Sequence, residues 1–351
     1  MREIRLVVTL VMLLGSPGLW AHHGPVTNAS LYDTDELVEL EGEMTEVFWH
    51  NPHTRGRLEV VEADGEVRVW EVELGAGPRS MEGRGLAAED FLGPMKVAGF
   101  VARRGNSSFG ALHVLLPNGE EMTRSDRPLR WSNVMVRDGS STIIDPARVT
   151  RDRETATSIF RMWETGRGAG PERDLSMDWL TERGREAAAT YDPVADNREI
   201  NDCRQGMPDM MFDPPPLHIV DNGDRITLEA AEYNTTRTIY MDTAASPEPE
   251  FSRTGYSTGR WVGDTLFVTT TNVDWPFYSD LGFPQSNQVT YLERFSVSDD
   301  GSFLHHSITI TDPVMATRPF TIERTREWAP GAEIPPYNCV VDWEEGAAIT
   351  R

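Results

Sequence analysis

The sequence predicts a mainly β protein with two barrels joined by a connector. Two stretches, at residues 38–116 and 218–328, contain runs in which apolar and polar residues alternate as in half-buried strands. Turns rich in glycine, asparagine and aspartate separate many of these runs. We therefore expect an OB-like small barrel, a helical connector and a lipocalin-like antiparallel β-barrel, with a β-sandwich as the alternative for the last part.

The first barrel is expected within residues 22–121. Residues 78–91 lack the strand alternation and suit a short helix. The strand candidates on either side of it are residues 38–49, 57–61, 67–74, 95–101 and 111–116. Three strands, a helix and two strands are the order of a five-stranded OB-type barrel.

Residues 122–200 are expected to form the connector, with helix candidates at 151–164 and 178–189. The second barrel is expected within residues 201–351. Its eight strand candidates are residues 218–220, 225–230, 236–241, 255–261, 265–271, 288–297, 303–311 and 320–328. The two cysteines, Cys203 and Cys339, bracket this part, and an oxidising compartment would join them in a disulfide.

Residues 1–21 have the parts of a secretory signal peptide. Arg2 and Arg5 precede an apolar run from Leu6 to Leu14, and a small residue, Ala21, ends the segment. The run is too short to span a bilayer, and no second apolar segment of membrane length follows. We expect a periplasmic or secreted protein, cut after Ala21; a cut after Gly18 is the alternative.

Charge restricts the partners. The chain has a net charge of −23, which disfavours nucleic acid and anionic lipid. A small-molecule ligand remains compatible with this charge, and the sequence leaves the oligomeric state open.

Histidines suggest a metal site. After the expected cut, His22 begins the mature chain, so its α-amine and imidazole can chelate one metal ion together. His53 is the expected third ligand, with His23 and His50 in reserve, because Pro52 stiffens the approach to His53. Copper is the expected metal, with zinc as the alternative. The competing interpretation is a flexible tail with histidines that bind nothing.

A second group of polar residues belongs to the expected large barrel. Strand alternation places Glu293, His306 and Arg324 on faces that are otherwise largely apolar. If those faces point inward, the three residues either satisfy one another in a structural network or act as an acid–base group, with Arg324 holding an anionic ligand.

Two sets of motifs resemble known families. Ala21-His22-His23-Gly24 and the Trp49-His50-Asn51-Pro52-His53 segment resemble small exported bacterial proteins that begin with His-His-Ser/Gly and carry Trp-x-Asn-Pro-His. Four further motifs resemble a second uncharacterised exported bacterial domain, over about residues 190–340: Gly206-Met207-Pro208, Thr238-Ile239-Tyr240-Met241-Asp242, Gly259-Arg260-Trp261-Val262-Gly263-Asp264-Thr265-Leu266 and Leu292-Glu293-Arg294-Phe295. The resemblance implies export and domain boundaries, and it implies no reaction.

These observations favour an exported metal-binding protein that binds or senses a small molecule. One alternative is an exported enzyme, using either the N-terminal histidine site or the acid–base residues of the large barrel. Another is a structural protein of the cell envelope.

Overall fold

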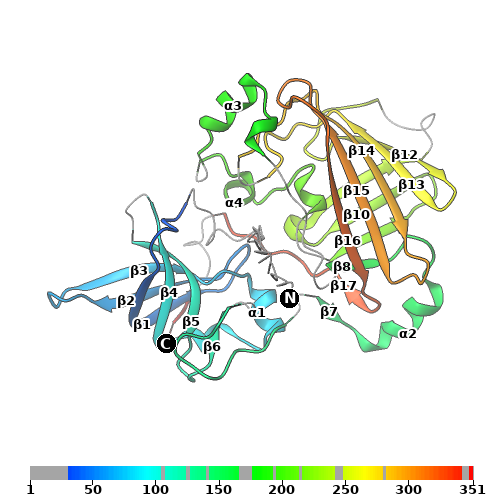
Figure 1. Ribbon diagram of the computed structural model, residues 1–351. Coiled ribbons are helices and arrows are strands. Elements are labelled where there is room, and N and C mark those ends of the chain that lie inside the picture. The colour runs from blue at the N-terminus through cyan, green and yellow to red at the C-terminus, as the bar shows by residue number, and fades with distance from the viewer. Residues whose placement is uncertain are drawn as a thin grey trace, which may run out of the picture.

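A computed structural model describes residues 31–103, 107–123, 127–139, 142–165, 176–192, 195–212, 216–241, 248–279, 282–341 and 348–350. The protein is mainly β, with 44% strand and 14% helix. Figure 1 shows two barrels side by side, the smaller built from the first part of the chain and the larger from the last part. The predicted fold class is therefore confirmed.

The small barrel has the predicted order of elements. Its strands close in the order β1-β2-β3-β5-β4, with β4 pairing back to β1 and β3 running parallel to β5. A short helix and a 3-10 turn separate β3 from β4, as the loss of alternation indicated. The elements are β1 (Val38–Phe48), β2 (Arg55–Val61), β3 (Val67–Glu73), α1 (Pro78–Gly83), η2 (Ala88–Phe91), β4 (Gly93–Val101) and β5 (Ser108–Leu115), and β6 (Glu121–Met122) pairs with β5.

Alternation along these strands builds the core of the small barrel. Met44, Leu58, Val72 and Phe109 are fully buried inside it. At Gly99 the strands β4 and β5 approach so closely that a Cβ would lie 1.9 Å from a backbone oxygen of the partner strand. Only glycine fits there, and the register shifts beside it.

The large barrel contains all eight predicted strands and one more. The additional strand is β8, which lies between β16 and β9 and closes the barrel. The strands are β8 (Met162–Thr165), β9 (Leu217–Asp221), β10 (Arg225–Ala230), β11 (Thr235–Tyr240), β12 (Tyr256–Val262), β13 (Thr265–Thr271), β14 (Thr290–Val297), β15 (Phe303–Thr311) and β16 (Phe320–Trp328). All neighbours are antiparallel except β11 and β12, whose long connection allows a parallel pair.

The helix predicted over residues 151–164 is wrong in its position. The helix α2 covers Pro146–Thr155, and the chain then turns and enters β8. Asp145 caps the helix by accepting a hydrogen bond from the Ala147 amide, and Pro146 occupies its first turn. The burial of Trp163 in the core of the large barrel explains why the following residues form a strand.

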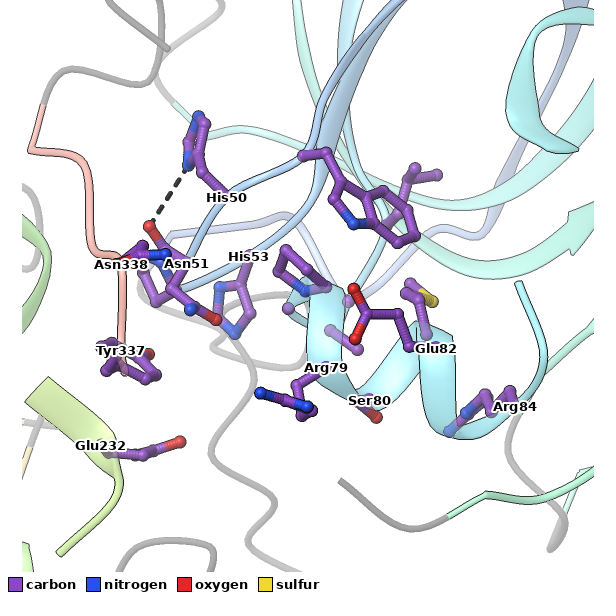
Figure 2. Close-up of a pocket in the computed structure, with 18 of the residues that line it drawn as sticks. His50, Asn51, His53, Arg79, Ser80, Glu82, Arg84, Glu232, Tyr337 and Asn338 are labelled. Carbon is purple, nitrogen blue, oxygen red and sulfur yellow. Dashed lines mark hydrogen bonds between the residues drawn. The ribbon is translucent and has the colours of Figure 1, made fainter. Parts of the chain in front are cut away.

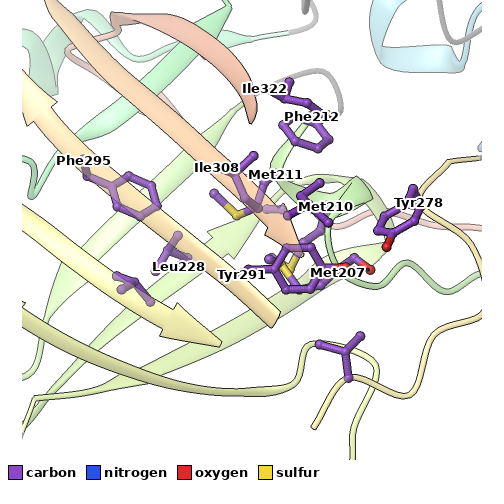
Figure 3. Packing of buried hydrophobic residues seen from close by; sticks show 14 of the residues in the cluster. Met207, Met210, Met211, Phe212, Leu228, Tyr278, Tyr291, Phe295, Ile308 and Ile322 are labelled. Atoms are coloured by element: carbon purple, nitrogen blue, oxygen red, sulfur yellow. Dashed lines mark hydrogen bonds between the residues drawn. The ribbon is translucent and has the colours of Figure 1, made fainter. Parts of the chain in front are cut away.

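One segment enters the core of the large barrel from outside the strands. Met207, Met210, Met211 and Phe212 are each at most 1% exposed and pack against inward side chains of β14 and β15, as Figure 3 shows. We call residues 205–212, which include η4 (Asp209–Met211), the plug. Two side chains hold its backbone. Gln285 Nε2, from the segment before β14, donates to the Met207 carbonyl at 2.8 Å, and Arg326 Nη2, from β16, donates to the Met211 carbonyl at 3.1 Å.

The predicted disulfide is present between Cys203 and Cys339, which are 136 residues apart. The chain beyond Cys339 returns to the small barrel, where β18 (Ala348–Thr350) pairs with β1. The remaining elements are β7 (Ile143–Ile144), η3 (Met177–Trp179), α3 (Glu182–Ala189), α4 (Arg198–Asp202), η5 (Glu232–Asn234) and β17 (Ala332–Glu333). Within the described ranges, no helix is long and apolar enough to cross a bilayer.

Candidate metal centre and ligand cleft

A cleft lies where the two barrels meet, with a cavity of about 640 Å³ (Figure 2). On the side of the small barrel it is lined by residues 49–53, by residues 74–82 and by Arg84. On the side of the large barrel it is lined by Pro216, Ala231, Glu232 and the tail around Tyr337 and Asn338. This volume suits a small-molecule ligand.

Backbone contacts join the two sides of the cleft. The Asn51 amide donates to the Asn338 carbonyl at 3.3 Å, and the Val340 amide donates to the Asn51 carbonyl at 3.1 Å. Gly77 allows the Asn51 turn to close against the start of α1, because a Cβ at this position would lie 2.6 Å from Asn51 Oδ1. Since Cys339 lies between Asn338 and Val340, the disulfide anchors the tail that holds this turn.

The turn presents His53 beside a buried carboxylate. His53 Nδ1 lies 3.3 Å from Glu73 Oε1, and Glu73 is 3% exposed. Among the described residues, Glu73 Oε1 has no hydrogen-bond partner, so this approach to His53 is a contact without hydrogen-bond geometry. A buried carboxylate oxygen in this condition is costly unless a cation or a donor reaches it.

The other oxygen of Glu73 is held from behind. Glu73 Oε2 accepts a hydrogen bond from the Tyr32 hydroxyl at 3.4 Å and another from Arg55 Nη2 at 3.5 Å. These two long contacts fix the carboxylate while leaving Oε1 directed at the imidazole. Burial lowers the pKa of His53. The negative charge of Glu73 opposes this shift, and the positive charge of Arg55 reinforces it. The imidazole is therefore neutral near pH 7, which is the form that binds metals.

The other predicted metal ligands stand in different places. His50 is buried and its Nδ1 lies 3.2 Å from the Asn51 carbonyl, and Figure 2 shows its ring on the far side of Asn51 from His53. His22 and His23 lie outside the described residues. Among the residues that the structure does describe, no three histidine, cysteine, aspartate or glutamate side chains are grouped as a metal site.

The predicted polar group of the large barrel points inward. His306 Nε2 lies 3.0 Å from Glu293 Oε1, and both residues are at most 2% exposed. The His306 ring stacks on Phe295, with a centroid distance of 4.4 Å. Arg324 lies opposite His306 in the register between β15 and β16 and is also buried. A catalytic role for these three residues stays a prediction.

Sequence reasoning missed the residue that neutralises Glu293. Arg237 on β11 donates to both oxygens of Glu293, at 3.0 Å to Oε1 and by a second bond to Oε2. Its remaining donors reach Ser257 at 3.1 Å and Thr270 at 2.7 Å. The signal was present in the alternation, because Thr235, Arg237 and Ile239 share the buried face of β11.

Glu73 was also missed, for a different reason. Trp70 and Val72 mark the inward face of β3, so alternation places Glu73 on the opposite face. That face is covered at the end of the strand by Tyr32 and the turn that carries His53. No local pattern reveals such a covering, because it comes from segments far away in the sequence.

Comparison with known proteins finds a match to a family model that covers the first part of the chain. Residues 11–108 match DUF6152, a family of unknown function. This agrees with the resemblance to an uncharacterised family that the histidine motifs indicated. No curated protein and no solved structure matches the chain.

Proposed function

We propose that the protein is an exported metal-binding protein that holds copper, or alternatively zinc, at His53 in the cleft between its barrels. One observation carries the proposal: the buried oxygen Glu73 Oε1 has no hydrogen-bond partner among the described residues and faces His53 Nδ1 at 3.3 Å. The cleft would also receive a small molecule beside the metal, since its cavity measures about 640 Å³.

The separation of these two atoms suits a shared tetrahedral cation such as zinc, and tetragonal copper(II) would draw the two ligands closer together. Two ligands on a tetrahedral metal with bonds of about 2.0–2.1 Å lie about 3.3–3.4 Å apart. An imidazole nitrogen and a carboxylate oxygen are both ordinary zinc ligands. If the metal instead binds the other ring nitrogen, Glu73 would accept a hydrogen bond from Nδ1 and orient the ring, as carboxylates behind metal-binding histidines commonly do. Both arrangements require His53 and Glu73.

The N-terminal histidines supply the further ligands in this proposal. Tyr32, near the start of the described chain, already contacts Glu73 through its hydroxyl. Tyr32 lies only nine positions after His23 in the sequence, and an extended chain of that length reaches about 30 Å. His22 with its free α-amine would favour copper, because this metal binds amine and imidazole nitrogen strongly.

Metal analysis of the mature protein tests the proposal. The protein is secreted without a tag, its N-terminus is checked by mass spectrometry, and bound copper and zinc are measured before and after titration of the metal-free form. We expect one metal ion per chain and a loss of affinity greater than about 100-fold in His53→Ala, since even an outer ligand is worth about 10–100-fold. His305→Ala, an exposed histidine on β15, is the control and should bind as the wild type does. Unchanged affinity in His53→Ala would overturn the proposal.

A chain with three glycines added before His22 tests the terminal chelate separately. Three residues move the α-amine away from His22 and also keep His23 out of the third position, where a single added glycine would create a new copper chelate. We expect weaker copper binding with little change in zinc binding, because the amine matters most for copper. Equal copper affinity in the two chains would remove the α-amine from the ligand set.

A further inference from the structure

A second cavity, of about 430 Å³, opens beside the plug of the large barrel and is lined by three arginines. Polar side chains around it include Asp274 and Asn287, while Val273, Trp275 and Pro276 form an apolar wall. The arginines are Arg198, Arg204 and Arg253.

Arginines that share a cavity without forming ion pairs are unusual in this acidic chain. Acidic residues outnumber lysine and arginine by 56 to 33, so most arginines have a carboxylate available. Arg57, Arg130, Arg148 and Arg225 all form ion pairs with carboxylates. Arg204 and Arg253, by contrast, have no ion pair with any residue in the described ranges.

The two guanidinium groups lie near enough to repel each other. Burial lowers the pKa of Arg253, and the positive charge of Arg204 lowers it further. Arg253 is only partly exposed, whereas Arg204 is open to solvent. Two cations at one cavity that form no ion pair within the described ranges create an electrostatic environment that an anion would stabilise.

The backbone around this cavity is well fixed. The Arg253 carbonyl accepts a hydrogen bond from the Met207 amide of the plug at 2.9 Å. At Gly206 a Cβ would lie 2.4 Å from the ring of Trp275, so only glycine lets the plug close against this wall. Arg204 directly follows Cys203, which the disulfide anchors. The two arginines are therefore presented by a constrained frame.

Carboxylates near the cavity do not neutralise both cations. Arg198 is paired with Asp202 at 3.1 Å, one turn along α4. Asp274 lines the cavity and forms no ion pair within the described part of the chain. Its charge reduces the attraction for an anion, which makes it a useful position for testing the site.

We propose that this cavity binds a small ligand with a phosphate or carboxylate group, held between Arg204 and Arg253. Guanidinium groups donate paired hydrogen bonds that match the oxygens of both kinds of anion. The volume exceeds that of the anionic group alone, so the remainder of the ligand would lie along the apolar wall of Val273, Trp275 and Pro276. The site is independent of the proposed metal centre.

Calorimetric titration of the intact mature protein tests this proposal, with inorganic phosphate and succinate as probes. Chloride holds the ionic strength constant, so that general screening does not imitate binding. We expect saturable binding of at least one probe, weakened about tenfold or more in Arg253→Gln and in Arg204→Gln. Asp274→Asn should bind about two- to fivefold more tightly because a competing charge is gone. Arg225→Gln, which removes an exposed paired arginine, is the control and should bind as the wild type does.

Thermal unfolding without the probes separates a binding role from a structural one. If the arginines only support the fold, Arg253→Gln should lower the melting temperature. If they form an anion site, removing one of two repelling cations should leave it unchanged or raise it, and the stabilisation by added anion should disappear. The proposal is overturned if neither probe binds up to about 10 mM, or if both arginine variants bind as tightly as the wild type.

Discussion

Two histidine–glutamate pairs, one in each barrel, lie in opposite electrostatic surroundings. In the large barrel, Arg237 and His306 supply hydrogen bonds to both oxygens of Glu293. In the small barrel, Glu73 has only long contacts to Oε2 and no hydrogen-bond partner for Oε1 within the described structure. Identical residue types thus close a network around the carboxylate in one place and leave an open carboxylate oxygen in the other. Within the closed network, His306 Nδ1 is the ring atom that has no hydrogen-bond partner among the described residues.

A third pair shows that a closed network is not special to the large barrel. His113 Nδ1 lies 2.9 Å from Glu121 Oε1, and Glu121 also accepts from three backbone amides, those of Arg130, Trp131 and Ser132. Small-barrel carboxylates can therefore be fully satisfied by their surroundings. The open oxygen of Glu73 belongs to a buried carboxylate beside His53, which lines the cleft, and this is why we assign it a ligand.

Removing Arg237 should produce the largest effect. In Arg237→Leu the buried carboxylate of Glu293 loses its main counter-charge, which should lower the free energy of unfolding by about 3–5 kcal/mol. Chemical denaturation measures this directly. The double variant Arg237→Leu with Glu293→Leu should recover much of the loss, since no uncompensated charge remains. Arg225→Leu, which breaks an exposed pair, should cost at most about 1 kcal/mol. A loss equally small in Arg237→Leu would contradict the closed network.

Acid should weaken the closed network through Glu293. Burial raises the pKa of Glu293, but the charge of Arg237 and the hydrogen bonds from His306 and Arg237 outweigh burial and lower it from 4.5 to about 2. Ionised Glu293 therefore stabilises the folded state above about pH 4.5, and this contribution is lost as the pH falls toward 2. The loss amounts to roughly 3 kcal/mol. Unfolding measured at pH 5 and pH 2.5 should show a steeper decline in the wild type than in the double leucine variant, which lacks the group.

His306 should add a smaller pH effect at milder acidity. Burial lowers the pKa of His306. The hydrogen bond and charge of Glu293 oppose this shift, whereas the positive charges of Arg326 and Arg237 reinforce it. The unfolded chain therefore takes up the proton first as the pH falls below about 6.5, and the folded state loses stability there. We expect the decline in the free energy of unfolding between pH 7 and 5 to be shallower in His306→Gln than in the wild type. Parallel stability curves for the two proteins over this range would show that His306 does not titrate in this way.

Strand alternation predicted more of the large barrel's network than of the cleft. It placed Glu293 and His306 inside the same barrel, since two-residue periodicity determines which side chains of a strand share a face. It did not connect Arg237 with them, because a barrel joins strands whose pairing no local pattern specifies. The strand β8 was missed because its four residues are too few for a clear pattern. Its pairing with β16 and β9 is also long-range, so no local pattern specifies it.

The cleft depends on contacts between segments far apart in the sequence. His53 was expected to be a ligand from its turn, but its neighbour Glu73 came from a strand whose alternation directs it away from the core. The tail at Asn338 and the turn at Asn51 meet through backbone hydrogen bonds, which leave no trace in the composition of either segment. The expected metal ligands His22 and His23 lie outside the described residues, so their part in the site stays a prediction.

Substituting Glu73 should produce the smallest change in stability and the clearest change in binding. In Glu73→Gln the side chain keeps its shape and loses a charge whose Oε1 has no hydrogen bond among the described residues. We expect the free energy of unfolding of the metal-free protein to change by less than about 1 kcal/mol, because little favourable interaction is lost. Metal affinity should nevertheless fall by about 10–100-fold, whether Glu73 binds the ion or orients His53.

The matched variant Glu293→Gln should do the reverse: it should destabilise the protein while leaving metal affinity unchanged. If both substitutions destabilise the protein equally and neither weakens metal binding, the two pairs are both structural, and Glu73 has no ligand.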